Sequence, residues 1–167
     1  MNSETILVKS KYYPDGVEVE KVKIIEFLKP ILGFNDYRKF CILNVDKEKN
    51  IPFFILQSVD NEKLCFIITD PNTFFNDYSV PVTKEEKEIL GLQDESKAII
   101  FVIASMTADI TNATVNLKGP IVINTLTHKA IQCVLINENY TTNQKLPIIK
   151  KSETEQKMKQ EQKKTDL

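Results

Sequence analysis

Short apolar runs separated by turn-forming residues recur along most of this 167-residue chain. In residues 17–20, Val-Glu-Val-Glu, apolar and charged side chains alternate, which is typical of a half-buried β-strand. Further apolar runs of strand length lie at residues 5–8, 40–45, 53–57, 64–68, 98–104, 113–117, 121–126 and 130–136. Many short strands at close spacing predict a mainly β domain, either a sandwich or a barrel.

Two features near the N-terminus predict where the chain turns and bends. Tyr13-Pro14-Asp15-Gly16 is a turn signal, because proline presets φ and glycine accepts a positive φ. After Val19 the apolar positions change from odd to even numbers, to Val22 and Ile24. Such a slip would turn the side chains to the other face, so we expect a β-bulge at Glu20-Lys21.

Three of the later runs indicate the architecture. Residues 98–104 are almost wholly apolar, which predicts a strand buried on both faces. Residues 121–126 and 130–136 flank Thr-His-Lys at 127–129, which predicts a hairpin with His128 in its exposed turn. Pro81 places the run at 78–82 on a sheet edge or at a bulge. Because the bulge and the edge proline supply curvature and protect edges, we expect a small, partly open antiparallel β-barrel.

One short α-helix is expected at residues 84–90. Thr83 and Glu86 form a capping box, in which the threonine hydroxyl and the glutamate side chain each satisfy a free backbone N–H. Gly91 stands where a left-handed residue ends a helix. The fold class predicted from the pattern is therefore mainly β, with one short α-helix.

The chain is expected to divide into a domain at 1–149 and a lysine-rich tail at 150–167. The tail has only Met158 and Leu167 as apolar residues, too few to offset the cost of ordering it. The tail is therefore expected to be disordered, with a basic tether for an acidic partner as the alternative. Its six lysines and four acidic residues leave sixteen basic and nineteen acidic residues in 1–149, a net charge of −3.

Composition excludes several function classes. A body with a net negative charge has no electrostatic reason to bind nucleic acid, and four isolated glycines cannot form a phosphate-binding loop. No run approaches the roughly 20 apolar residues that span a membrane. The N-terminus has neither the basic start nor the apolar run of a signal peptide, so a cytoplasmic protein is expected. Three distant cysteines argue against a disulfide framework and a zinc site, and no cofactor is expected.

Two other functions remain open from the residues alone. A small enzyme would use Asp60 and Asp70 as a carboxylate pair, or Cys133 as a nucleophile, in a concave site. A direct RNA-binding module of the OB type would need a basic stripe with exposed aromatic rings.

Partner-binding candidates come from aromatic and polar residues next to the predicted strands. Phe53-Phe54 and Phe74-Phe75 place adjacent rings on opposite faces, so Phe54 and Phe75 are the candidates for exposed rings on a protein-binding surface. Gln57, Ser58 and Asp60 follow an apolar strand, where their side chains could face a partner.

Four segments resemble the FliW family of flagellar assembly factors, in the family's order and spacing. They are Phe-Leu-Lys-Pro-Ile-Leu-Gly-Phe at 27–34, Leu-Gln-Ser-Val-Asp at 56–60, Phe-Ile-Ile-Thr-Asp-Pro at 66–71 and Asn-Leu-Lys-Gly-Pro-Ile-Val-Ile-Asn at 116–124. The resemblance covers roughly residues 5–140. Two residues depart from the family pattern: Pro30 stands where a glycine is usual and Leu32 where a proline is common.

The resemblance implies a small β-barrel without enzymatic activity and with two partners. One is flagellin, whose terminal segments are amphipathic helices that stay unpaired until the filament forms. The other is CsrA, a translational repressor that binds flagellin mRNA and that FliW captures once flagellin is exported. The chain is expected to be a monomer when free, and to bind no RNA or membrane itself. Asp70, in the Thr-Asp-Pro motif, joins Asp60 as a candidate for the charged rim of the CsrA interface.

Overall fold

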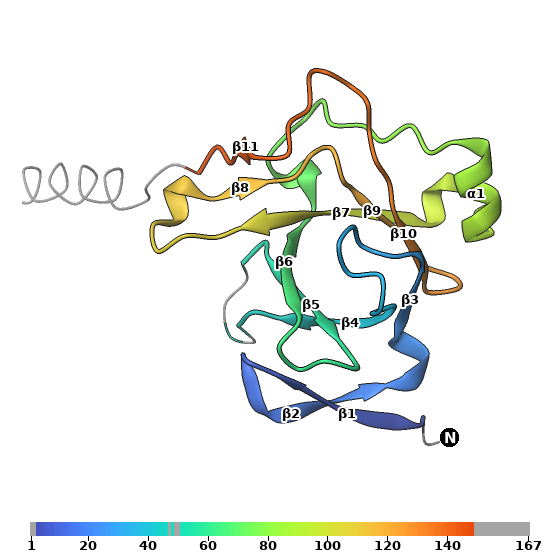
Figure 1. The fold of residues 1–167 in the computed structure, drawn as a ribbon, viewed down its shortest axis with the longest axis vertical. Helices are drawn as coiled ribbons and strands as arrows, with labels where there is room; N and C mark the ends of the chain where they lie inside the picture. Colours follow the sequence, from blue (N-terminus) through green and yellow to red (C-terminus); the bar gives the residue numbers. More distant parts are fainter. Residues whose placement is uncertain (1–2, 47, 49–50, 149–167) are drawn as a thin grey trace, which may run out of the picture.

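A ring of β-strands with a two-stranded hairpin against its outside makes up most of the molecule (Figure 1). This computed structural model describes residues 3–46, 48 and 51–148, so the predicted tail at 150–167 lies outside the described residues. The strands are β1 (Thr5–Ser10), β2 (Tyr13–Glu20), β3 (Ile25–Lys29), β4 (Lys39–Asn44), β5 (Phe54–Ser58), β6 (Cys65–Thr69), β7 (Ala98–Ser105), β8 (Thr114–Val115), β9 (Ile121–Asn124), β10 (Lys129–Gln132) and β11 (Gln144–Lys145). The α-helix is α1 (Lys84–Leu90), and short 3₁₀ turns lie at Lys21–Lys23, Pro71–Thr73, Glu95–Lys97 and Ile110–Asn112.

The barrel is closed by strand β7, which pairs with β6 on one side and with β8 and β9 on the other. Its second half pairs with β6, and its first half, Ala98 to Phe101, pairs with β9. The ring therefore runs β3-β4-β5-β6-β7-β9-β10 and returns to β3. The predicted small barrel with one short helix is confirmed, with two differences. It is closed where a partly open barrel was expected, and the β10–β3 pair is parallel where an antiparallel one was expected.

Large aromatic and aliphatic side chains fill the interior of the ring. Phe27 and Phe40 are fully buried, with their ring centroids 5.3 Å apart in an edge-to-face arrangement. Each such side chain contributes roughly 1.5–3 kcal/mol through its burial. Strand β7 contributes to clusters on both faces, with Phe101 and Ile103 packed inside the barrel and Val102 outside. Burial on both faces was predicted for 98–104, but Ile99 is 40% exposed.

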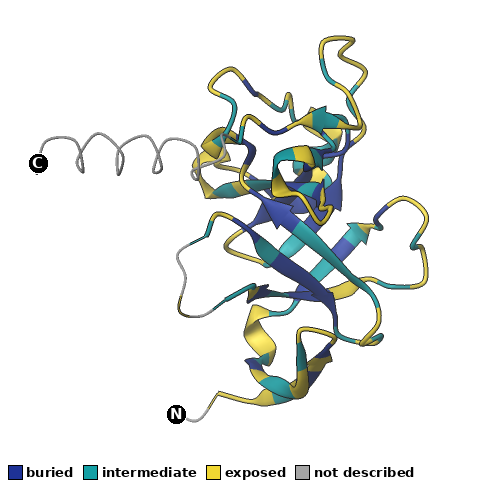
Figure 2. Cartoon of the chain, turned by 90° about the vertical axis from the view of Figure 1, so that its left-hand side faces the viewer, coloured by how far each residue is buried: buried dark blue, intermediate teal, exposed yellow. Residues whose placement is uncertain are grey.

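The β1–β2 hairpin covers the outer face of β4, β5 and β6, as Val8 and Val19 pack on Cys41, Leu43 and Ile55. Figure 2 shows the exposed outer side of this hairpin and the buried strands of the barrel above it.

The predicted turn at Tyr13–Gly16 is wrong. The chain reverses at Lys11 and Tyr12, just before the predicted turn. Residues 14–16 lie inside β2, where the register of the pairing with β1 shifts. Gly16 has a φ of +87°, and a Cβ there would lie 2.7 Å from Leu7 Cδ1. Proline and glycine therefore shape a bulge rather than the turn between the strands.

Two further predictions about strand regularity are also wrong. The 3₁₀ turn Lys21–Lys23 separates β2 from β3, where a bulge at Glu20-Lys21 was expected. The buried positions on both sides of it, Val19 and Ile25, keep odd numbers, whereas Val22 is 67% exposed. Residues 78–82 form a loop instead of a strand, and the Val82 N–H donates to the carbonyl of Val80.

Helix α1 has the ends that the sequence predicts. Thr83 Oγ1 accepts a hydrogen bond from the Glu86 N–H at 3.1 Å, and Gly91 is left-handed with a φ of +62°. The Glu86 side chain, however, accepts from the Thr83 hydroxyl and from the Cys133 thiol. The predicted β9–β10 hairpin is confirmed, with His128 in its turn at a φ of +57°.

Candidate functional site

An apolar groove of about 580 Å³ lies between the loop after β6 and the chain that continues from β10. It is lined by Ser79, Val80, Pro81, Thr83, Glu86, Val134, Leu135, Ile136, Asn137 and Tyr140. Val134 is 65% exposed and Ile136 is 93% exposed, whereas Leu135 between them is half-buried. Two adjacent apolar side chains that project from a groove indicate a surface that binds another molecule.

One end of the apolar groove is lined by Tyr140, which packs on the buried Tyr78. The rings of Tyr78 and Tyr140 lie 4.9 Å apart, and the Tyr78 hydroxyl donates to the Leu117 carbonyl at 2.8 Å. Burial raises the pKa of Tyr78 well above its usual value, so the hydroxyl remains a donor. The Tyr140 hydroxyl accepts a hydrogen bond from the Ser79 N–H. These contacts hold the two walls together at this end.

The other end of the apolar groove is the capped start of α1. The buried Cys133 thiol donates to Glu86 Oε2 at 2.7 Å, and Glu86 Oε1 accepts from Thr83 Oγ1 at 3.0 Å. Burial, together with the Glu86 carboxylate, raises the pKa of the Cys133 thiol far above its usual range. A nucleophilic cysteine needs an accessible thiolate. The arrangement therefore contradicts a catalytic role for Cys133.

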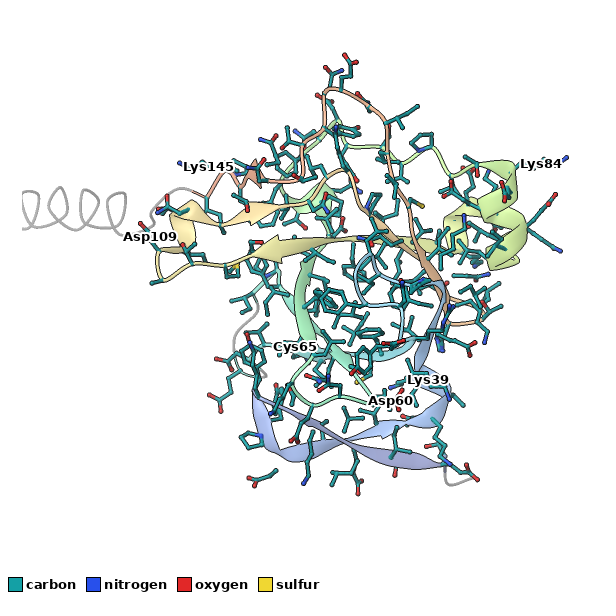
Figure 3. All side chains as sticks on the ribbon, viewed as in Figure 1. Lys39, Asp60, Cys65, Lys84, Asp109 and Lys145 are labelled. Carbon is teal, nitrogen blue, oxygen red and sulfur yellow. The ribbon has the colours of Figure 1, made fainter. Side chains whose placement is uncertain are left out.

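A second groove, which we call the charged groove, lies between the barrel and the β1–β2 hairpin and has a volume of about 570 Å³. It is lined by Ile6, Lys21, Val22, Ile24, Glu26, Lys39, Val59, Asp60, Thr127, His128 and Lys129. Figure 3 shows Lys39 and Asp60 on this side of the barrel. Lys129 Nζ lies 3.0 Å from Glu26 Oε2, and this hydrogen bond is the main reason that the pKa of Glu26 is lowered. His128 Nδ1 contacts the Val22 carbonyl oxygen, so the β9–β10 turn is joined to the 3₁₀ turn Lys21–Lys23 between β2 and β3.

The sequence suggested that Gln57 and Ser58 could face a partner, but both are fully buried. Gln57 Nε2 lies 3.1 Å from each of the carbonyl oxygens of Ser58, Asn61 and Leu64. Ser58 Oγ accepts hydrogen bonds from the N–H groups of Asp60 and Asn61. Both side chains therefore hold the β5–β6 turn from inside.

The expectation that Phe54 and Phe75 expose their rings is wrong, because both are half-buried. Phe54 points into the barrel, where its ring lies 5.9 Å from that of Phe101. Phe75 packs on the cluster around Phe53 and Tyr78. The extended conformation that would separate adjacent rings ends at Thr69, since residues 71–73 form a 3₁₀ turn.

Asp60 and Asp70 are both exposed, as their proposed place on a rim requires. They lie on opposite sides of β6 in the chain, however, and this arrangement argues against the carboxylate pair of the alternative enzyme hypothesis. Asp70 also has a structural role, because its Oδ1 accepts the Asn72 N–H at 2.9 Å and caps the 3₁₀ turn. Within residues 3–46, 48 and 51–148, no three His, Cys, Asp or Glu side chains are grouped as metal ligands would be.

Sequence reasoning missed Val134 and Ile136 because they lie in an apolar run that reads as a buried strand. The ladder of β10 with β9 ends at Gln132, and beyond it the apolar residues reach the surface. In the part of the chain that the structure describes, no helix has the length and apolar character needed to cross a membrane.

Comparisons with known proteins agree on one family. A family model described as FliW protein matches residues 9–146. The flagellar assembly factor FliW of Natranaerobius thermophilus is 37% identical over 131 residues, which cover 78% of this chain and 85% of that relative. The flagellar assembly factor FliW of Geobacter sulfurreducens is 39% identical over 127 residues, covering 75% and 77%. A crystal structure of the flagellar assembly factor FliW superposes with a TM-score of 0.78 at 30% identity, covering 88% of this chain and 99% of that one.

Proposed function

Because this chain belongs to the FliW family of flagellar assembly factors, we propose that it binds flagellin in the cytoplasm and antagonises the repressor CsrA when flagellin is exported. The release of CsrA from flagellin mRNA then relieves the repression of translation. The family membership confirms the resemblance seen in the sequence. The family is one of assembly factors and not of enzymes, so this chain is not an enzyme.

The apolar groove is the observation that supports flagellin binding most directly. Val134 and Ile136 project into solvent beside half-buried Val80 and Leu135. Water-exposed apolar side chains carry a free-energy cost that a bound apolar segment removes. Flagellin held before assembly has such unpaired apolar segments, as the family resemblance implies.

The net charge of −3 in residues 1–149 supports CsrA as the second partner. A repressor that binds mRNA needs basic groups to neutralise phosphates, and an acidic protein docked beside them repels the RNA. The same charge argues against the direct RNA-binding alternative. The charged groove also contains Glu26 and Asp60 among its lysines, so it does not form a basic stripe.

Calorimetry with full-length monomeric flagellin tests the first half of the proposal. Burial of the apolar groove should give a complex at micromolar concentrations and a negative heat-capacity change. Ile136→Asp should weaken the complex at least about tenfold, since a buried unpaired carboxylate costs well over 1.4 kcal/mol. Leu126→Asp is the matched control, because Leu126 is 72% exposed on the β9–β10 turn at the opposite end of β10. No complex with flagellin at tens of micromolar would refute flagellin binding.

A further inference from the structure

Beyond the end of β10 at Gln132, the chain continues its hydrogen bonding to residues 118–120 on one side only. The Cys133 N–H donates to the Pro120 carbonyl, and the Leu135 N–H donates to the Lys118 carbonyl, both at 2.8 Å. Backbone groups of successive residues in an extended chain point to opposite sides. The N–H and C=O groups of Val134 and Ile136 therefore point away from residues 118–120.

These backbone groups, the N–H and C=O of Val134 and Ile136, have no hydrogen-bond partner among the residues that the structure describes. The opposite wall of the apolar groove does not supply one, because Ser79 bonds to the Tyr140 hydroxyl and Val82 bonds to Val80. Val134 and Ile136, two alternate residues with free backbone groups on the same side, form a short edge that can accept a strand.

The side chains of the apolar groove limit what can occupy it. Glu86 is the one ionisable carboxylate in the lining, and both of its oxygens accept hydrogen bonds, from Thr83 and Cys133. Among the described residues, no lysine, arginine or histidine lines the groove. An acidic segment would therefore find no counter-charge there, and the one carboxylate is already hydrogen-bonded, which favours an uncharged, apolar occupant.

We propose that flagellin contributes an extended apolar segment that adds as a β-strand to the free edge of Val134 and Ile136. The proposal rests on the proposed function, that flagellin binds in this groove. Side chains of the added strand would alternate, one set packing inward on Val80 and Leu135 and the other lying beside Val134 and Ile136. A docked helix satisfies its own backbone hydrogen bonds and would leave these groups unpaired. Removal of an edge N–H should therefore weaken flagellin binding by strand addition but not binding by a docked helix.

Replacement of one N–H group tests the strand addition. Ile136→Pro removes a free-edge N–H and keeps an apolar side chain, while the Cys133 and Leu135 hydrogen bonds on the other side stay intact. Its affinity for full-length flagellin should fall at least about tenfold. Ile136→Val, the matched control, keeps the N–H and should stay within about twofold of the parent. Both variants should melt close to the parent, because Ile136 is 93% exposed.

Amide hydrogen exchange of the unmodified protein provides a second readout that does not depend on the folding of the proline variant. The amides of Val134 and Ile136 should exchange more slowly in the flagellin complex than in the free protein. If flagellin binds equally well to Ile136→Pro, or leaves both amides unprotected, strand addition is wrong while flagellin binding stands. If the free protein protects both amides increasingly with its own concentration, the edge pairs with a second copy and the proposal is overturned. If the parent binds no flagellin at all, the proposed function itself fails.

Discussion

At the scale of single residues, buried polar groups explain why part of the predicted site lies inside the molecule. Gln57 and Ser58 follow an apolar strand, which in the sequence suggests a polar surface. Their side chains instead bond to backbone groups of the turn that follows, although the buried Gln57 Oε1 has no hydrogen-bond partner among the described residues. Hydrophobic pattern cannot distinguish these two outcomes, because both place polar residues after a strand.

Gln57→Leu should destabilise the fold without a direct effect on partner contacts. The leucine fills a similar volume but removes the Nε2 donor from the carbonyl oxygens of Ser58, Asn61 and Leu64, of which those of Asn61 and Leu64 keep a backbone N–H donor. A buried hydrogen bond contributes about 0.5–1.5 kcal/mol net, so a loss of that size is expected in the free energy of unfolding by urea. Glu62→Gln, at an exposed position of the same turn, should change it by less than about 0.5 kcal/mol. A Gln57→Leu variant as stable as the parent would contradict this role.

At the scale of elements, the structures with local signals were predicted well. The ends of α1 depend on residues close in sequence, and Thr83 and Gly91 behave as expected, whereas the Glu86 side chain bonds to the Thr83 hydroxyl and the Cys133 thiol instead of a backbone N–H. Closure of the barrel depends on β7 meeting β9 and on β10 meeting β3, contacts between distant segments. No local pattern encodes such pairings, so the sequence indicated a barrel but not how it closes.

The Pro14-Gly16 region shows the opposite failure, in which a strong local signal misleads. Proline and glycine favour a turn in the sequence, but here Pro14 and Gly16 lie within β2 and form a bulge in its pairing with β1. The apolar run at 130–136 was misread for a related reason. Its first half is a core strand, whereas Val134 and Ile136 lie on a free edge that only the three-dimensional arrangement reveals.

Thr83→Ala should destabilise the protein through helix α1. The alanine removes the acceptor for the Glu86 N–H and also the hydroxyl that bonds to the Glu86 carboxylate. Loss of an N-cap costs about 1 kcal/mol, which lowers the melting temperature by roughly 2–4 °C for a protein of this size. Thr83→Ser keeps the hydroxyl and should melt within a degree or so of the parent. Equal melting temperatures for the alanine and serine variants would show that the cap contributes nothing.

At the scale of the whole molecule, two grooves lie at opposite ends of β10. The charged groove is beside the start of the strand at Lys129, and the apolar groove begins just after its end at Gln132. In Figure 1 the hairpin that borders the charged groove and the loops that border the apolar groove lie on different sides of the barrel. The two kinds of surface are therefore separate in space, which allows the two proposed partners to be tested with separate variants.

Asp60→Lys should slow the association with CsrA. Asp60 is exposed beside the charged groove, and no hydrogen bond or ion pair of its carboxylate occurs within the described residues, so the change should leave the melting temperature nearly unaltered. Rim charges act mainly on the association rate, and their effect is screened over about 8–10 Å at physiological salt. Stopped-flow measurements at low and physiological salt should therefore show a difference that shrinks as salt rises.

Asp70→Lys provides the comparison for Asp60→Lys. It removes the cap of the 3₁₀ turn at Pro71–Thr73, so it should lower the melting temperature in addition to any effect on the association rate with CsrA. An unchanged association rate for Asp60→Lys would remove Asp60 from the interface.

A gel shift of flagellin leader RNA bound to CsrA, titrated with this protein, tests the central claim most directly. The account predicts that RNA is released from CsrA as the protein is added, that the protein alone shifts no RNA, and that prior addition of flagellin delays the release. The second result follows from the net charge of −3 in residues 1–149. A CsrA–RNA complex that persists at excess protein, or a direct shift of the RNA by this protein, would contradict the account.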